Sequence, residues 1–236
     1  MKRQILLFYI YHILGFPAFW LPVLFLFLTE QKGLNSEVAL SVIGIYSLFT
    51  PLVEVPTGVV ADKFSRKLSL ILGNAIFALG LASIFIIPNG SLPPFILFSA
   101  ILAIGSGLIS GSDTALLYDS LETFQRENEF RSITAKLGSV GLLSSAGYAA
   151  IGGWLGELSL SLPISVSVVF YFLAALVSVF FVEGKTSKKA NDLQKRNYLV
   201  FVWDSVKQIF STKALTLLFF GSSFIFFFFL GQKWMY

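Results

Sequence analysis

The sequence contains no cysteine, which excludes a disulfide framework, a thiolate nucleophile and a metal site built on thiolate ligands. Charged residues are also scarce, at 13% of the chain, and His12 is the only histidine, so it has no metal-binding or triad partner. Neither HExxH nor the phosphate-binding pattern GxxxxGK[ST] occurs. The stretch from Gly107 to Gly111 has the wrong spacing for a hydrolase serine. We therefore expect a protein without a cofactor, without a metal and without enzymatic activity.

Apolar residues make up 56% of the chain, and 26 of its residues are phenylalanine. A soluble domain cannot bury that much apolar surface, whereas a bilayer accommodates it. The formal net charge is +4, but the basic residues fall in the gaps between apolar runs, where they orient membrane spans. The composition therefore predicts a polytopic membrane protein that contacts lipid and does not bind nucleic acid.

Seven predominantly apolar stretches have the length, about 20 residues, that a helix needs to cross the hydrocarbon core. They run approximately over 5–28, 38–60, 68–87, 94–118, 133–155, 162–182 and 214–231. They lack the alternation of a membrane β-barrel, so we predict helices. The first resembles a signal peptide, but it continues to Leu28 without a small-residue cleavage site, and we expect it to stay as a span. Prolines 17 and 22 in the first run, and 51 and 56 in the second, predict kinks.

Lysine and arginine are distributed unevenly between the alternate gaps. Of the 17 in the chain, all but Lys32 and Lys233 fall on one side. This asymmetry is typical of the cytoplasmic face of a cell membrane. We therefore expect a multi-pass plasma membrane protein whose N-terminus is cytoplasmic and, with seven spans, whose C-terminus lies outside.

The chain divides into three parts at a break in composition. A six-helix transmembrane bundle is predicted over 1–183, followed by a polar, Lys-rich cytoplasmic linker over 184–213 whose second half has the pattern of an amphipathic interfacial helix. The seventh helix, 214–236, then stands without a bundle to join. The sequence thus suggests a truncated or fragmentary form of a longer protein, to which a homodimer partner or a separate C-terminal half could supply the rest.

The link between the second and third runs reads GVVADKFSRK and contains Gly58, Asp62, Arg66 and Lys67. The spacing of these residues, and their cytoplasmic position, resembles the signature of the major facilitator superfamily. That family's first half also has six spans, a long cytoplasmic linker and the start of a seventh span. The resemblance implies an all-α membrane fold and secondary active transport of a small organic solute. Ser65 stands where the family usually has glycine, which would stiffen the turn.

A second stretch, from Ser110 to Leu121, is similar to one found with the EVPTG form of the second run in bacterial members taken to be solute or drug exporters. Export driven by an ion or proton gradient is therefore the expected direction. The usual antiport markers are absent, because Ile101 occupies the position of the span-four arginine and YAAIGG, residues 148–153, replaces GPxxGG. Other residues would have to carry the proton. Proton-coupled uptake and a non-transporting fragment or sensor are the alternatives.

Glu54 and Asp113 place carboxylates inside predicted spans, where a charge costs about 2.5 to 3.5 kcal/mol on insertion scales. Either carboxylate could line a cavity and take up a proton or pair with a cationic substrate. The alternative is a hydrogen bond to a neighbouring helix that only fixes packing. His12 has the same two interpretations, since a reference pKa of about 6.5 suits proton transfer.

Asp119 lies six residues after Asp113, about 120° further around the helix and closer to the cytoplasm. We expect it to form an ion pair with Arg66 and to join Asp62 and Lys67 in a cytoplasmic charge cluster. The alternative is a solvated carboxylate at a helix end, because surface ion pairs contribute little.

Small residues recur at steps of three or four along the fifth run and form one face: Gly138, Gly141, Ser145, Ala149, Gly152 and Gly156. Such a face lets another helix backbone approach closely. In the resembled family this span contacts the second bundle. Tight packing within one bundle is the other interpretation.

Overall fold

The computed structural model describes residues 2–63 and 65–183, all within the first of two compact units, Met1–Ala190. Every regular element in this part of the chain is a helix, and it contains no strand. The predicted linker at 184–213 and the predicted seventh helix at 214–236 lie outside the described residues.

Each of the first six apolar runs appears as one helix or as a series of helices. The elements are α1 (Lys2–Leu14), η1 (Ala18–Trp20), α2 (Leu24–Leu26), the π-helical η2 (Phe27–Gln31), α3 (Ser36–Lys63), α4 (Arg66–Ser83), α5 (Pro93–Ile109), α6 (Ser112–Thr123), η3 (Glu127–Glu129), α7 (Phe130–Leu158) and α8 (Ser161–Val179).

Four stretches in the described part are long and apolar enough to cross a membrane, and the bent pair Arg3–Trp20 and Leu24–Gln31, 42° apart, raises this to as many as five. α7, with 29 residues, falls outside this set and is rich in glycine and serine. The described chain thus contains several apolar helices of membrane-spanning length.

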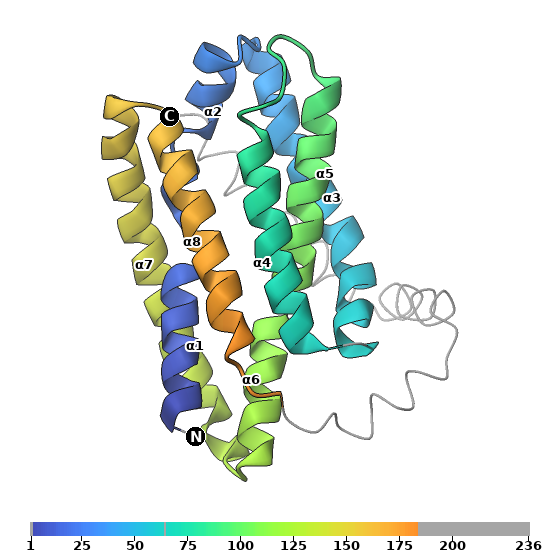
Figure 1. The fold of residues 1–236 in the computed structure, drawn as a ribbon, viewed down its shortest axis with the longest axis vertical. Helices are drawn as coiled ribbons and strands as arrows, with labels where there is room; N and C mark the ends of the chain where they lie inside the picture. The colour runs from blue at the N-terminus through green and yellow to red at the C-terminus, as the bar shows by residue number, and fades with distance from the viewer. Residues whose placement is uncertain (1, 64, 184–236) are drawn as a thin grey trace, which may run out of the picture. The chain divides into compact units, whose positions relative to one another are not determined.

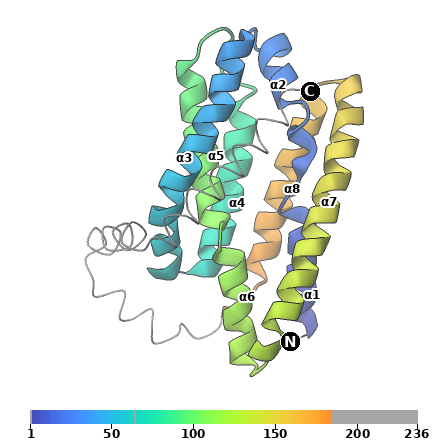
Figure 2. The ribbon, with the colours of Figure 1, turned by 180° about the vertical axis from the view of Figure 1, so that it is seen from behind.

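The helices form two groups that lie side by side (Figures 1 and 2). α5 packs against both α3 and α4, while α1 packs against α7 and α8, and α4 packs against α8 to join the groups. One apolar core, around Trp20 and Phe77, fills the half of the bundle that contains α2. A second core, around Phe8 and Leu116, fills the half that contains α6.

Two apolar runs are interrupted rather than continuous. The first run loses α-helical structure between Leu14 and Leu24, whereas α3 stays one helix through both of its prolines. The fourth run, which the sequence analysis treated as one helix, is broken between α5 and α6 at Ser110 and Gly111. Gly111 has φ of +73°, a conformation that only glycine adopts without strain.

Candidate functional site

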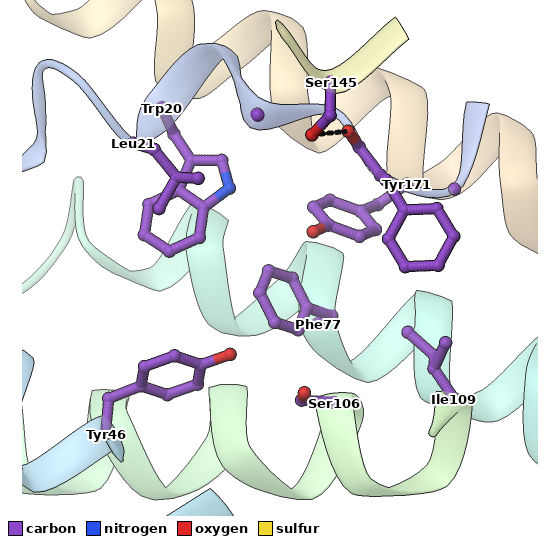
Figure 3. A pocket seen from close by; sticks show the side chains of 11 residues that line it. Trp20, Leu21, Tyr46, Phe77, Ser106, Ile109, Ser145 and Tyr171 are labelled. Carbon is purple, nitrogen blue, oxygen red and sulfur yellow. Dashed lines mark hydrogen bonds between the residues drawn. The ribbon is translucent and has the colours of Figure 1, made fainter. Parts of the chain in front are cut away.

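A cavity of about 240 Å³ lies between the helices (Figure 3). Every one of the first six apolar runs contributes to its wall, from Gly15 in the first to Tyr171 in the sixth. Aromatic rings dominate the lining, and none of the lining residues in the described chain carries a charge. The rings are those of Phe16, Trp20, Tyr46, Phe77 and Tyr171.

The break in the first run supplies the largest part of the cavity wall, from Gly15 to Leu21. In this segment the backbone leaves the α-helical hydrogen-bonding pattern, so its carbonyl groups need other partners. Hydroxyl groups of α7 and α8 donate to two of these carbonyls, Ser145 to Phe16 at 3.4 Å and Ser167 to Pro17 at 3.2 Å. Tyr148 of α7 also donates to the carbonyl of Ile13, near the end of α1, at 2.9 Å. The irregular segment is therefore held by neighbouring helices.

Two glycines let α7 approach the broken segment closely. A Cβ added at Gly152 would lie 2.2 Å from the carbonyl oxygen of Phe19, and one at Gly156 would lie 2.5 Å from Cγ1 of Val23. At the other end of the small-residue face, a Cβ at Gly138 would meet no described atom within 4 Å, and one at Gly141 would first meet the carbonyl oxygen of His12 at 3.9 Å. The face packs within the bundle at its Gly152 end.

Ser106 reaches the cavity because the glycines on either side of it face other helices. A Cβ at Gly105 would lie 2.7 Å from the backbone nitrogen of Phe77 on α4, and one at Gly107 would lie 2.7 Å from Oγ1 of Thr57 on α3. Residues two apart on a helix point about 200° apart. The GxG of the fourth run thus packs α5 between α3 and α4 and leaves the serine to line the cavity.

Glu54 lies close to this wall. Ser110, the residue directly after α5, donates a hydrogen bond from its hydroxyl to Oε1 of Glu54. The backbone N–H of Ser110 also bonds the carbonyl of Ser106 at 2.9 Å. The Glu54 carboxylate is therefore hydrogen-bonded one helical turn away from a cavity-lining residue.

Asp113 follows the break, in the first turn of α6, and accepts a hydrogen bond from the N–H of Thr114 at 2.6 Å. Its carboxylate lies within electrostatic range of both Tyr11 and His12 on α1. The Tyr11 hydroxyl in turn accepts a hydrogen bond from Nδ2 of Asn74 at 3.1 Å. The sequence candidates Asp113 on α6 and His12 on α1 thus lie within electrostatic range of one another.

Two polar atoms in this region lack a partner. Oδ1 of Asn74, a residue with no exposed surface, and Nδ1 of His12 are buried without a hydrogen-bond partner among the described residues. Buried polar atoms are normally paired, with protein groups or with ordered water. Asn74 and His12 therefore keep unused hydrogen-bonding capacity inside the bundle.

The predicted ion pair between Arg66 and Asp119 is present. Nη1 of Arg66 lies 2.6 Å from Oδ2 of Asp119, and it also donates to the carbonyl of Ala115 at 3.0 Å. Lys67 lies in the first turn of α4. Asp62 lies near the end of α3, and its side chain is outside the described part of the structure. A Cβ at Gly58 would meet no described atom within 4 Å.

Glu183 joins this cluster although the sequence analysis did not identify it. Its carboxylate accepts from the backbone N–H of Arg66 at 2.8 Å and from the hydroxyl of Ser65 at 2.7 Å. Ser65 itself accepts from the N–H of Leu68 at 3.0 Å and caps α4. A serine cap and a carboxylate both stabilise a helix N-terminus, which gives Ser65 a function that glycine would lack.

Lys32 lies at the opposite end of α4 and is only 6% exposed. Its ammonium group donates to the carbonyl oxygens of Ile87 at 2.7 Å and of Phe85 at 3.4 Å, just beyond the end of the helix. Burial lowers the pKa of Lys32. Lys32 is one of the two basic residues that do not fall on the Lys- and Arg-rich side of the predicted spans. Its hydrogen bonds link the end of the first run to the end of α4.

Charged and small residues are the candidates that the sequence offers, and the aromatic lining of the cavity is not among them. Trp20, Tyr46, Phe77 and Tyr171 come from four different runs, and aromatic residues are common in all of them. Prolines 17 and 22 were the available signal for the break in the first run. The Ser-Gly-Ser sequence at 110–112 was the corresponding signal for the fourth.

Comparison with known proteins identifies the family. Residues 7–235 match the sequence model of the Major Facilitator Superfamily. A protein named "Uncharacterized transporter" from Buchnera aphidicola subsp. Schizaphis graminum (strain Sg) is 33% identical over 114 residues, which are 48% of this chain and 27% of that protein. The matched part of the chain thus spans about a quarter of this relative's length. The chain belongs to the Major Facilitator Superfamily, whose members are multi-pass membrane transporters of small solutes and are generally not enzymes.

Proposed function

We propose that the protein is a secondary active transporter that moves a small organic solute across the cell membrane by alternating access. The main support for this proposal is the break in the first run. Its irregular backbone lines a cavity to which six apolar runs contribute residues. Irregular backbone at membrane depth is tolerated only where it is buried in protein or lines a cavity. Discontinuous spans of this kind form the substrate sites of many transporters.

The proposed topology has six spans in one bundle, a cytoplasmic linker and a seventh span, with the N-terminus in the cytoplasm. The uneven distribution of lysine and arginine supports this orientation. In this arrangement the Arg66–Asp119 pair lies at the cytoplasmic end of the bundle. A second bundle, from whichever chain supplies it, faces the cavity on the side opposite these helices.

Asp113 is the proposed proton carrier, with His12 as its neighbour and Glu54 as a second carboxylate at the same break. The nearby unpartnered atoms of Asn74 and His12 support access for water, which a proton carrier needs. The similarity of residues 110–121 to bacterial exporters supports export in exchange for protons. The cavity itself accommodates a solute of modest size.

The test uses everted membrane vesicles that contain the full chain and generate a pH gradient by respiration, followed with a fluorescent dye. Small aromatic amines, aromatic acids and uncharged aromatic compounds are added one at a time. We expect a transported solute to dissipate the gradient, and Asp113→Asn to abolish this dissipation at unchanged protein level. Glu157→Gln removes an exposed carboxylate from the far end of α7 and should transport normally.

Normal dissipation by Asp113→Asn would contradict the role of Asp113. Failure of the unmodified protein to respond to any solute of the panel, in everted or right-side-out vesicles, would contradict transport itself. Dissipation only in right-side-out vesicles would reverse the proposed direction.

A further inference from the structure

The cavity wall has the chemistry of an aromatic cage. Phe77 lies between two other rings, with its centroid 4.4 Å from that of Tyr171 and 6.1 Å from that of Trp20. Figure 3 shows these rings and that of Tyr46 around the same space. The face of an aromatic ring carries partial negative charge and attracts cations within about 6 Å of its centroid.

The charges near the cavity have one sign. Glu54 is hydrogen-bonded through Ser110 one turn from Ser106, and Asp113 follows the same break. In the described part of the chain, no lysine or arginine lines the cavity. The lysines and arginines with described side chains lie toward the two ends of the bundle: Arg3, Lys32, Arg66, Lys67, Arg126, Arg131 and Lys136. A bound anion would therefore lack a nearby counter-ion, whereas a cation would have two.

The side chains of the wall also offer few hydrogen-bond acceptors. The side-chain acceptors of the wall are the hydroxyl oxygens of Ser106, Ser145, Tyr46 and Tyr171, and the hydroxyl of Ser145 donates its hydrogen to the carbonyl of Phe16. A primary ammonium group has three N–H donors that must be satisfied when it leaves water. A quaternary or tertiary ammonium group has none or one, and its charge is spread over carbon atoms that contact rings well.

From these three observations we propose that the cavity binds small quaternary or tertiary ammonium compounds with an apolar group. The alkylammonium group contacts the rings of Trp20, Phe77 and Tyr171 and faces the side of the cavity nearest Glu54 and Asp113. This inference rests on the proposed transport function, because it names the class of solute that the transporter would move. Binding of that class can nevertheless be measured without transport.

The experiment follows the fluorescence of Trp20 in a variant of the full chain that keeps it as the single tryptophan, with Trp154→Phe, Trp203→Phe and Trp234→Phe, in lipid nanodiscs. Four probes of similar size are titrated: benzyltrimethylammonium, its uncharged isostere 2,2-dimethylpropylbenzene, the primary amine benzylamine and the anion phenylacetate. Each Kd refers to the free concentration of the probe in water.

We expect benzyltrimethylammonium to bind saturably and about tenfold more tightly than its uncharged isostere and than benzylamine. Phenylacetate should give no saturable signal. The double variant Glu54→Gln, Asp113→Asn should weaken binding of the cation about tenfold and leave binding of the isostere unchanged. Glu37→Gln, which removes an exposed carboxylate at the start of α3, should change neither Kd.

Equal Kd values for the cation and its isostere, or tighter binding of phenylacetate, would overturn the proposed class of ligand. An unchanged cation affinity in the double carboxylate variant would overturn the role of the two carboxylates. Cation-selective binding supports the proposal even if the vesicle experiment finds no transport. If the protein transports other solutes but shows no cation-selective binding, the proposed class of ligand is wrong and the proposed transport function still stands.

Discussion

The first run and α3 each contain two prolines, yet one is broken and the other is a single helix. In α3, hydroxyl groups bond carbonyls of their own helix: Ser47 to Ile43 at 3.1 Å, Thr50 to Tyr46 at 2.8 Å and Thr57 to Val53 at 2.8 Å. In the first run, the corresponding hydroxyl groups belong to α7 and α8.

The difference shows that proline alone does not determine where a span breaks. Proline removes one backbone donor, and its ring strains the preceding turn. A full break frees several carbonyls at once, and inside a membrane these need partners from elsewhere in the protein. Ser145, Tyr148 and Ser167 supply such partners to the first run, and Gly152 lets α7 come close enough to do so.

Gly152→Ala should break this arrangement most strongly. The new methyl group would lie 2.2 Å from the carbonyl oxygen of Phe19, so α7 or the broken segment must move. Overpacking typically costs about 1 to 3 kcal/mol of the free energy of unfolding, and we expect the upper end of this range because the obstacle is backbone. Reversible unfolding in mixed micelles measures the change.

Gly138→Ala is the matched control on the same helix, because its methyl group meets no described atom within 4 Å. It should leave stability unchanged or raise it by up to about 1 kcal/mol through helix propensity. Equal effects of the two substitutions would show that α7 does not depend on close approach at Gly152.

Ser167→Ala should have the next largest effect. Its buried hydroxyl hydrogen is shared between the carbonyls of Pro17, at 3.2 Å, and Pro163, at 2.9 Å, and the substitution leaves the Pro17 carbonyl without this donor. We expect a loss of about 2 kcal/mol. Ser47→Ala removes an exposed hydroxyl bonded to its own helix and should cost less than about 0.5 kcal/mol. A larger loss of stability for Ser47→Ala than for Ser167→Ala would contradict the expected difference between α3 and the broken first run.

Lys32→Met tests the contact between the end of the first run and the end of α4, and it should have the smallest effect. The change keeps the length of the side chain but removes its hydrogen bonds to the carbonyls of Phe85 and Ile87. We expect a loss of about 1 kcal/mol, measured in the same unfolding assay. Lys136→Met, at an exposed position on α7, should have no effect, and an equal loss there would rule out a specific contact.

Much of the helical framework could be predicted from the sequence, because the length and apolar composition of a span are local properties. The ion pair between Arg66 and Asp119 was also predictable, since both residues lie near the same end of neighbouring runs. The cavity was not, because its wall combines residues from six runs and depends on which way each helix faces. Glu183 was missed for the same reason. It accepts a hydrogen bond from the backbone N–H of Arg66, which lies 117 residues away in the sequence.

The central claim is that the broken first run borders a cavity that solutes can enter. Because the chain has no cysteine, Ser106→Cys places the only thiol in the protein at the cavity wall. Ser99→Cys is the control, two turns away on α5, fully buried and hydrogen-bonded to Val42. The account predicts that the small cationic reagent 2-aminoethyl methanethiosulfonate labels the cysteine at 106 at least about tenfold faster than that at 99. Equal and slow labelling at both positions in the folded protein would contradict it.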